Sequence, residues 1–108
     1  MTKILITGAS GMVGKHLVDM CLDKGYYVRG IDIRLDDRYL EKKYWGDNFD
    51  FFQADLRDFD RCKVLVDDID VVFHVAGVKG SPKRAAEQPN DYFTPMLQMN
   101  TNMAEAAR

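Results

Sequence analysis

A glycine-rich segment, Thr7–Gly14 with the sequence TGASGMVG, carries the strongest chemical signal in the chain. Between a strand and a helix, the first glycine of such a segment permits a tight turn. The second lets the backbone approach a pyrophosphate, and the third lets the helix pack closely on the strand. Amides at the helix start have no intrahelical acceptor and can bind the phosphates. Rather than a mere glycine-rich turn, we therefore predict a dinucleotide site formed by Gly8, Ser10, Gly11, Met12, Val13 and Gly14.

An acidic residue, Asp32, follows Gly14 by 18 positions (32 − 14), close to the spacing of about 20 typical of a carboxylate that binds the adenosine ribose. Such a carboxylate accepts hydrogen bonds from both ribose hydroxyls and repels a 2′-phosphate. Arg34 favours NADP, because a guanidinium can bind a 2′-phosphate. Arg34 can equally be a solvated loop charge. We predict NAD as the cofactor, with NADP as the less favoured alternative.

The elements that must position these residues alternate between strands and helices. The apolar run Lys3–Thr7 predicts a buried strand, and apolar residues at helical spacing from Met12 predict a helix that Gly25 ends. Tyr27–Ile31 predicts a second strand. The polar stretch at residues 34–47 predicts a loop with a short helix.

The second half of the chain continues the alternation. Asp50–Ala54 predicts a third strand, Asp58 is placed to cap a helix, and Ile69–Val75 predicts a fourth strand. Residues 77–93 are rich in glycine, proline and lysine and predict an irregular crossover. A final helix is expected from Thr94 or Pro95 to the end of the chain.

Strands joined through single helices indicate β-α-β units, whose right-handed crossovers give a parallel sheet with helices on both faces. We predict an α/β fold: a Rossmann-type doubly wound parallel sheet of strand order 3-2-1-4, in one unit over residues 1–108. Because this fold normally has further strands, we expect the chain to be its N-terminal part, with the catalytic and substrate-binding part absent. The fourth strand would then keep an unpaired apolar edge, so we expect the isolated chain to self-associate or to be marginally stable.

Composition argues against several classes of partner. Fifteen Lys and Arg against 17 Asp and Glu give a net charge of −2, without the basic excess that nucleic acids or anionic membranes attract. No apolar run approaches the roughly 20 residues of a membrane span, and no signal-peptide pattern is present. Cys21 and Cys62 lack redox or metal-ligand spacing. We expect reduced, buried thiols in a cytoplasmic protein and no metal site.

The glycine spacing T-G-x-x-G-x-x-G, rather than G-x-G-x-x-G, resembles the short-chain dehydrogenase/reductase superfamily, and specifically its extended branch of NAD(P)-dependent nucleotide-sugar epimerases and dehydratases. Three further segments resemble this branch: residues 54–58 (ADLRD), 72–77 (VFHVAG) and 101–108 (TNMAEAAR). The matches spread over nearly the whole chain. The last segment has one residue fewer between its threonine and asparagine than the family pattern, and Met96 stands where many relatives carry asparagine.

The resemblance implies further cofactor contacts. Asp55, otherwise a loop or capping acid, and Leu56 would contact the adenine, at the carboxyl end of a strand where ligands of open sheets bind. Ala76 would line the cofactor near the nicotinamide. We also place Lys79 at the cofactor. The basic residues of the crossover can alternatively reach a sugar-nucleotide diphosphate or remain solvated, namely Lys79, Lys83 and Arg84.

Two other features have plainer interpretations. His74 closes a buried strand, so a core histidine with a satisfied hydrogen bond is favoured over an acid or base. Met96, Met99 and Met103 form a stripe on the last helix that is typical of a core or a subunit interface. In the resembling family this helix commonly packs against its mate, so we expect a homodimer through it.

The family's catalytic pair is Tyr-x-x-x-Lys with an upstream Ser or Thr, in which the tyrosine is the general acid/base and the lysine lowers its pKa. Tyr39 and Lys43 fit the bare pattern but lie in the polar stretch, so we interpret them as coincidence and expect no catalytic residue in this chain. The resemblance implies the NAD(P)-binding half of a nucleotide-sugar epimerase, dehydratase or reductase that transfers hydride between nicotinamide and sugar, inactive as 108 residues alone. The alternative is a non-catalytic dinucleotide-binding or sensing module of the same superfamily.

Overall fold

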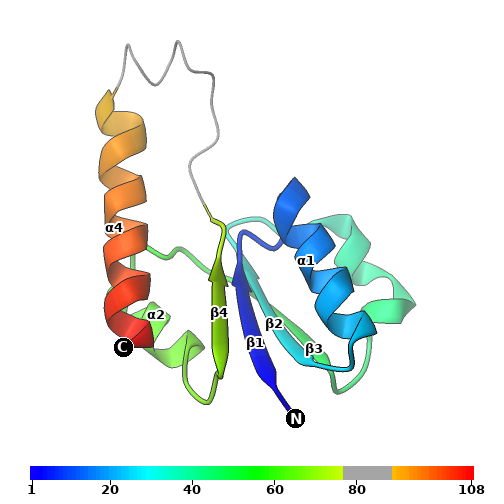
Figure 1. Ribbon diagram of the computed structural model, residues 1–108. Helices are drawn as coiled ribbons and strands as arrows, with labels where there is room; N and C mark the ends of the chain where they lie inside the picture. The colour runs from blue at the N-terminus through cyan, green and yellow to red at the C-terminus, as the bar shows by residue number, and fades with distance from the viewer. Residues whose placement is uncertain (77–88) are drawn as a thin grey trace.

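Among the described residues, four parallel strands form one sheet in the order β3-β2-β1-β4 (Figure 1). The strands are β1 Lys3–Thr7, β2 Tyr27–Asp32, β3 Phe49–Gln53 and β4 Val71–His74. The predicted α/β class, Rossmann-type sheet and strand order 3-2-1-4 are thus confirmed. The bounds of two strands were wrong: β3 begins and ends one residue earlier than predicted, and β4 is shorter at both ends. At the start of β4, the Ile69 amide instead donates to Val66 O at 3.1 Å in the turn that follows the second helix.

The structure, a computed structural model, describes residues 1–76 and 89–108, and side chains over 1–76 and 98–108. Helix α1 (Met12–Asp23) covers one face of the sheet, while α2 (Phe59–Leu65) and α4 (Pro89–Ala107) lie together on the other (Figure 1). Of the predicted features, the basic residues of the crossover and the side chain of one methionine lie outside the described part: Lys79, Lys83, Arg84 and Met96.

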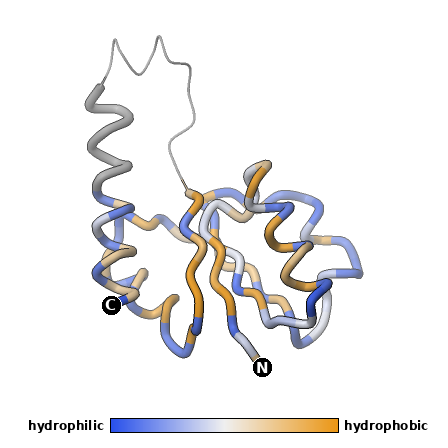
Figure 2. The backbone as a smooth tube through the Cα atoms, in the orientation of Figure 1, coloured by the Kyte–Doolittle hydropathy of each residue, from blue (hydrophilic) through white to orange (hydrophobic). Residues whose placement is uncertain are grey.

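Strand β1 is buried on both faces, as its continuous apolar sequence requires. Ile4 and Ile6 pack in the α1 layer, whereas Leu5 points to the α2 and α4 layer, and all three are at most 3% exposed. Figure 2 shows this apolar track running through the centre of the sheet. The free thiols Cys21 and Cys62 are buried in the two layers, as expected.

Helix α4 begins at Pro89, not at the predicted Thr94 or Pro95. Proline has a fixed φ and no N–H, which suits the first turn of a helix, so the residue that indicated an irregular crossover instead begins the helix. Within α4, Met103 is 2% exposed in the core and Met99 packs beside it. These two methionines therefore serve the core of this chain. No helix in the described part is long and apolar enough to cross a membrane.

Between β2 and β3 the predicted short helix is two 3-10 turns, Asp37–Leu40 and Lys42–Tyr44. They bury Tyr39 and Tyr44, which are 6% and 4% exposed, against Phe49, with ring centroids 5.1 and 5.4 Å away. The rings complete the α1 layer over β2 and β3. The aromatic side chains thus cover this part of the sheet, as crossover helices cover the rest of it.

These two tyrosines give a prediction for alkaline pH. Burial raises the pKa of Tyr39 above its ordinary value and, with a hydrogen bond to Asp19, raises the pKa of Tyr44 to about 12. Unfolded tyrosines ionise near pH 10, so the folded state is at full stability below about pH 10 and loses it as the pH rises toward the folded pKa. Denaturant unfolding across this range should show that decline, and the double variant Tyr39→Phe/Tyr44→Phe should decline less steeply. Equal slopes would contradict the assignment.

The outer edge of the sheet is apolar at β4. Within the described residues β4 pairs with β1 alone, and Val71 and Phe73 are 41% and 39% exposed. Such an edge is a template for further strand pairing. Self-association of the isolated chain stays a prediction.

Candidate functional site

The loop after β1 has a backbone that two of its glycines make possible. Gly8 has φ of +70°, and a Cβ there would lie 2.9 Å from the Ala76 amide nitrogen. At Gly14, a Cβ would lie 2.0 Å from Gly8 O. Side chains at either position would collide with backbone. The positive φ of Gly8 fits the tight turn predicted for the first glycine, and Gly14 lets α1 pack closely on the loop after β1, as predicted for the third. The close approach of Gly8 to the backbone after β4 was not predicted.

The middle glycine differs, because it borders open space. Among the residues that the structure describes, a Cβ at Gly11 would meet only Gly8 O, at 3.3 Å. The first helical hydrogen bond runs from Lys15 N to Gly11 O at 2.9 Å, so the amides of Met12, Val13 and Gly14 have no intrahelical acceptor. Gly11 is the N-cap of α1 and supplies no side-chain cap. Of these three residues Gly14 is buried, whereas Met12 and Val13 are exposed, so the amides of Met12 and Val13 border a surface on which an anion can approach the backbone.

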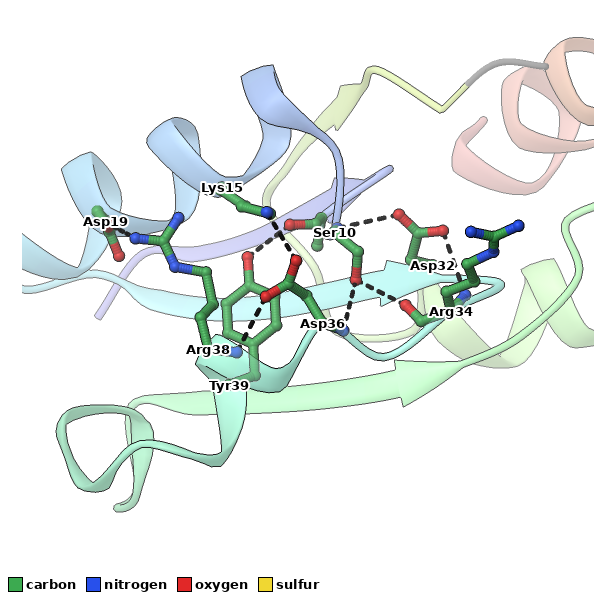
Figure 3. Close-up of polar contacts among 9 residues, drawn as sticks. Ser10, Lys15, Asp19, Asp32, Arg34, Asp36, Arg38 and Tyr39 are labelled. Carbon is green, nitrogen blue, oxygen red and sulfur yellow. Dashed lines mark hydrogen bonds and ion pairs between the residues drawn. The ribbon is translucent and has the colours of Figure 1, made fainter. Parts of the chain in front are cut away.

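Asp32 ends β2 directly beside this loop (Figure 3). Its Oδ2 accepts a hydrogen bond from Ser10 N at 2.9 Å, and its Oδ1 accepts one from Ile33 N at 2.7 Å. The carboxylate is half-buried and keeps further lone pairs for hydroxyl donors. The predicted pairing of Asp32 with the glycine loop is thus present in space. The Ser10 amide, however, is already used by Asp32.

Ser10 also joins the glycine loop to the segment after β2, which the sequence did not reveal. Its hydroxyl donates to Arg34 O at 2.6 Å and accepts from Asp36 N at 3.1 Å. Lys15 Nζ lies 2.6 Å from Asp36 Oδ2. The Arg34 side chain is exposed and makes no hydrogen bond within the described part of the chain. These contacts join residues 21 to 26 positions apart, so no local pattern could announce them.

Asp55 and Leu56 follow β3 at the same edge of the sheet. The Asp55 carboxylate accepts three hydrogen bonds from the Arg57 guanidinium, of 3.0, 3.0 and 2.6 Å, which lowers the pKa of Asp55. Leu56 is 4% exposed, and its carbonyl accepts from Asn102 Nδ2 at 3.0 Å. Its side chain is a core residue, so any ligand contact by Leu56 would come from its backbone.

A polar chain connects β1, β4 and α4 through His74. Thr7 Oγ1 accepts from Ala76 N at 3.1 Å and lies 2.7 Å from His74 Nδ1. His74 Nε2 lies 2.7 Å from Asn100 Oδ1, an acceptor, so we assign the imidazole proton to Nε2 and let Thr7 donate to Nδ1. Both ring nitrogens are satisfied, in agreement with the interpretation as a structural histidine.

Tyr39 and Lys43, which fit the Tyr-x-x-x-Lys pattern, each contact a different part of the protein. The buried Tyr39 hydroxyl donates to Ala9 O at 2.5 Å, below the glycine loop. Lys43 Nζ lies over the Tyr44 ring, 5.0 Å from its centroid. Tyr39 supports the loop from inside the protein, as expected for a coincidental match.

The described residues also border a cavity of about 460 Å³ at the opposite end of the strands, where β4 begins. It lies between the ends of α2 and α4 and the start of β4, at Lys63, Asp70 and Ala107. Ligands of open α/β sheets bind outside the carboxyl ends of the strands, which makes the glycine-loop edge the candidate site. No cluster of potential metal ligands occurs among the described residues.

Comparison with known families decides the affiliation. The model of the NAD dependent epimerase/dehydratase family matches residues 4–108. The chain belongs to this family. Membership in the epimerase/dehydratase family confirms the resemblance to the extended short-chain dehydrogenases/reductases.

The similar proteins are about three to four times as long as the chain. UDP-glucose 4-epimerase of Mycolicibacterium smegmatis is 35% identical over 109 aligned positions, which cover 98% of this chain and 34% of that protein. A 3 beta-hydroxysteroid dehydrogenase/Delta 5-->4-isomerase of Mycobacterium tuberculosis is 36% identical over 70% of this chain and 19% of its own length. The chain thus spans about a third or less of these relatives.

A solved structure shows the same fold. The UDP-glucose-4-epimerase of Stenotrophomonas maltophila, with bound NAD and formylated UDP-arabinopyranose, superimposes with a TM-score of 0.83 at 28% identity. The match covers 98% of this chain and 33% of that one. The UDP-glucose 4-epimerase of Thermus thermophilus, in complex with NAD, gives a TM-score of 0.78 at 27% identity over 97% of this chain and 33% of that one.

Proposed function

We propose that this chain binds NAD at the carboxyl ends of β1, β2 and β3. The observation that carries the proposal is the open surface at Gly11, bordered by the amides of Met12 and Val13, which have no intrahelical acceptor. The Asp32 carboxylate lies beside it and accepts a hydrogen bond from the Ser10 amide of the same loop. A pyrophosphate, which needs close contact with the backbone, fits the surface at Gly11, and the neighbouring ribose diol fits the Asp32 carboxylate. The bound NAD of similar epimerases supports the same cofactor.

Each part of NAD has residues that fit it. The pyrophosphate would lie on the amides of Met12 and Val13, and the adenosine ribose would donate to Asp32. Beyond them, Asp55 and the Leu56 backbone would hold the adenine, and Ala76 would border the nicotinamide side. NAD supplies the hydride acceptor, while this chain's residues bind and orient it. Lys79 remains a proposed contact in the crossover.

Asp32 is expected to make the site prefer NADH over NADPH by at least about tenfold, because a carboxylate there repels a 2′-phosphate. Titrations of both reduced cofactors, followed by their fluorescence, measure the ratio. Asp32→Asn should weaken NADH binding and narrow the ratio. Asp50→Asn removes an exposed acid at the other end of the sheet, where it accepts from the Tyr27 hydroxyl, and should leave the ratio unchanged. Tighter NADPH binding by the unmodified protein would refute NAD selection.

The reaction itself is proposed at the level of the whole protein. We infer hydride transfer between the nicotinamide and a nucleotide-linked sugar by an epimerase, dehydratase or reductase, because the family and the similar solved epimerases act in this class. Tyr39, the one tyrosine that fits the catalytic pattern, lies in the core, so the 108 residues alone should show no turnover. We further propose a cytoplasmic homodimer that associates through α4.

A further inference from the structure

Beside the proposed ribose site, Asp36 is held in place from several sides (Figure 3). Its amide donates to Ser10 Oγ at 3.1 Å, and its Oδ1 accepts from Arg38 N at 2.9 Å. Its Oδ2 lies 2.6 Å from Lys15 Nζ. The two charged side chains are only 28% and 29% exposed, so water screens their attraction less than at an open surface. The position of Lys15 is therefore set by Asp36.

Lys15 lies close to the residues that would contact the adenosine ribose. It follows Gly14 on the first turn of α1, and its partner Asp36 is bonded to Ser10. Ser10 in turn donates its amide to Asp32. A single residue, Ser10, thus separates the Lys15–Asp36 pair from the carboxylate that would bind the ribose diol.

We infer that Asp36 is a specificity-determining residue, which pairs with Lys15 and so keeps this ammonium from a ribose 2′-phosphate. The inference rests on the proposed NAD site. Two carboxylates then exclude NADP by different means: Asp32 repels the 2′-phosphate directly, whereas Asp36 neutralises the nearby cation that could bind it. The lowered pKa of Asp36, which its hydrogen bond with Lys15 causes, is consistent with a charged pair at neutral pH.

The pairing has a consequence for cofactor exchange. Removing Asp32 alone ends the direct repulsion but leaves Lys15 neutralised, so NADPH binding should improve only in part. Removing both negative charges leaves an unpaired ammonium on a flexible stem beside the site, and a lysine binds phosphate as a point charge. Arg34 is the competing cation, since its guanidinium is exposed. The two cations can be distinguished by removing each in turn.

The test uses Asp32→Asn, Asp32→Asn/Asp36→Asn, and this double variant with either Lys15→Met or Arg34→Met. Asparagine at 36 keeps an oxygen for the Arg38 amide, so the turn keeps its cap. Dissociation constants for NADPH and NADH come from fluorescence titration, and melting temperatures establish folding. We expect the double variant to bind NADPH at least about tenfold more tightly than Asp32→Asn does. Lys15→Met should abolish that gain, and Arg34→Met should keep it.

Other outcomes overturn the inference. If adding Asp36→Asn does not tighten NADPH binding, or if Arg34→Met abolishes the tightening and Lys15→Met does not, then Lys15 does not contact the 2′-phosphate. In either case the proposed function still holds as long as the unmodified protein binds NADH. Failure of the unmodified protein to bind NADH would remove the proposed function and this inference together. Asp36→Ser, which can also cap the Arg38 amide, provides a second variant and should give the same gain.

Discussion

Gly14→Ala is expected to lower the free energy of unfolding by about 3 kcal/mol or more, because overpacking against rigid backbone is among the most costly single substitutions. The new Cβ would lie 2.0 Å from Gly8 O, 2.7 Å from Gly8 C and 2.9 Å from Ala9 Cα. All three atoms belong to the loop backbone, so no side chain can rotate away. Helix α1 would have to move off β1, and the loop that presents Gly11 would move with it.

Urea unfolding followed by circular dichroism measures this loss. Met20→Ala is the matched control, because Met20 is on the same helix and 56% exposed. We expect the control to stay within about 0.5 kcal/mol of the unmodified protein. Unchanged stability of Gly14→Ala would mean that the helix and loop are not in the contact described.

Gly11→Ala is expected to affect binding and not stability: the free energy of unfolding should change little, while NADH binding weakens by about a hundredfold or more. Gly11 has φ of −79°, which alanine adopts readily, and its Cβ would meet one atom at 3.3 Å. The methyl group would occupy the surface where the pyrophosphate needs to touch the backbone. Loss of that contact with free amides removes charge-assisted hydrogen bonds, each worth about 1.5–3 kcal/mol.

Two measurements on Gly11→Ala separate binding from folding. The melting temperature should stay close to that of the unmodified protein, while the dissociation constant for NADH rises. Met20→Ala again serves as the control and should bind NADH normally. If Gly11→Ala binds NADH as tightly as the unmodified protein, the middle glycine serves the turn alone and the phosphates lie elsewhere.

The sequence was sufficient for β1, the glycine loop and the end of β2, because their signals are local. A β-branched run closed by glycine, three glycines at fixed spacing and an acid after the next strand each depend on neighbouring residues. Parallel β-α-β connectivity then places Gly8, Gly11 and Asp32 at one edge of the sheet. The structure brings Asp32 within one hydrogen bond of the loop, as this reasoning requires.

Other parts depend on contacts between distant segments and could not be anticipated. The two tyrosines after β2 carry no helical or strand periodicity, and only their packing on Phe49 shows that they belong to the core. Arg29 lies in a strand but donates from Nη1 to Leu65 O and Asp67 O, at 2.7 and 3.0 Å, where it binds the end of α2. The Lys15–Asp36 pair likewise forms only once the sheet has brought β2 beside α1.

The most direct test of the NAD site is an NMR titration of the isotope-labelled protein with NAD that follows the backbone amide signals. We predict the largest shifts at Gly11, Met12 and Val13, with smaller ones at Ile33 and Leu56. The amides at the cavity at the opposite end of the strands, around Asp70 and Ala107, should stay unchanged. Shifts confined to that cavity, or no saturable shifts in the glycine loop, would contradict the assignment of this edge as the NAD site.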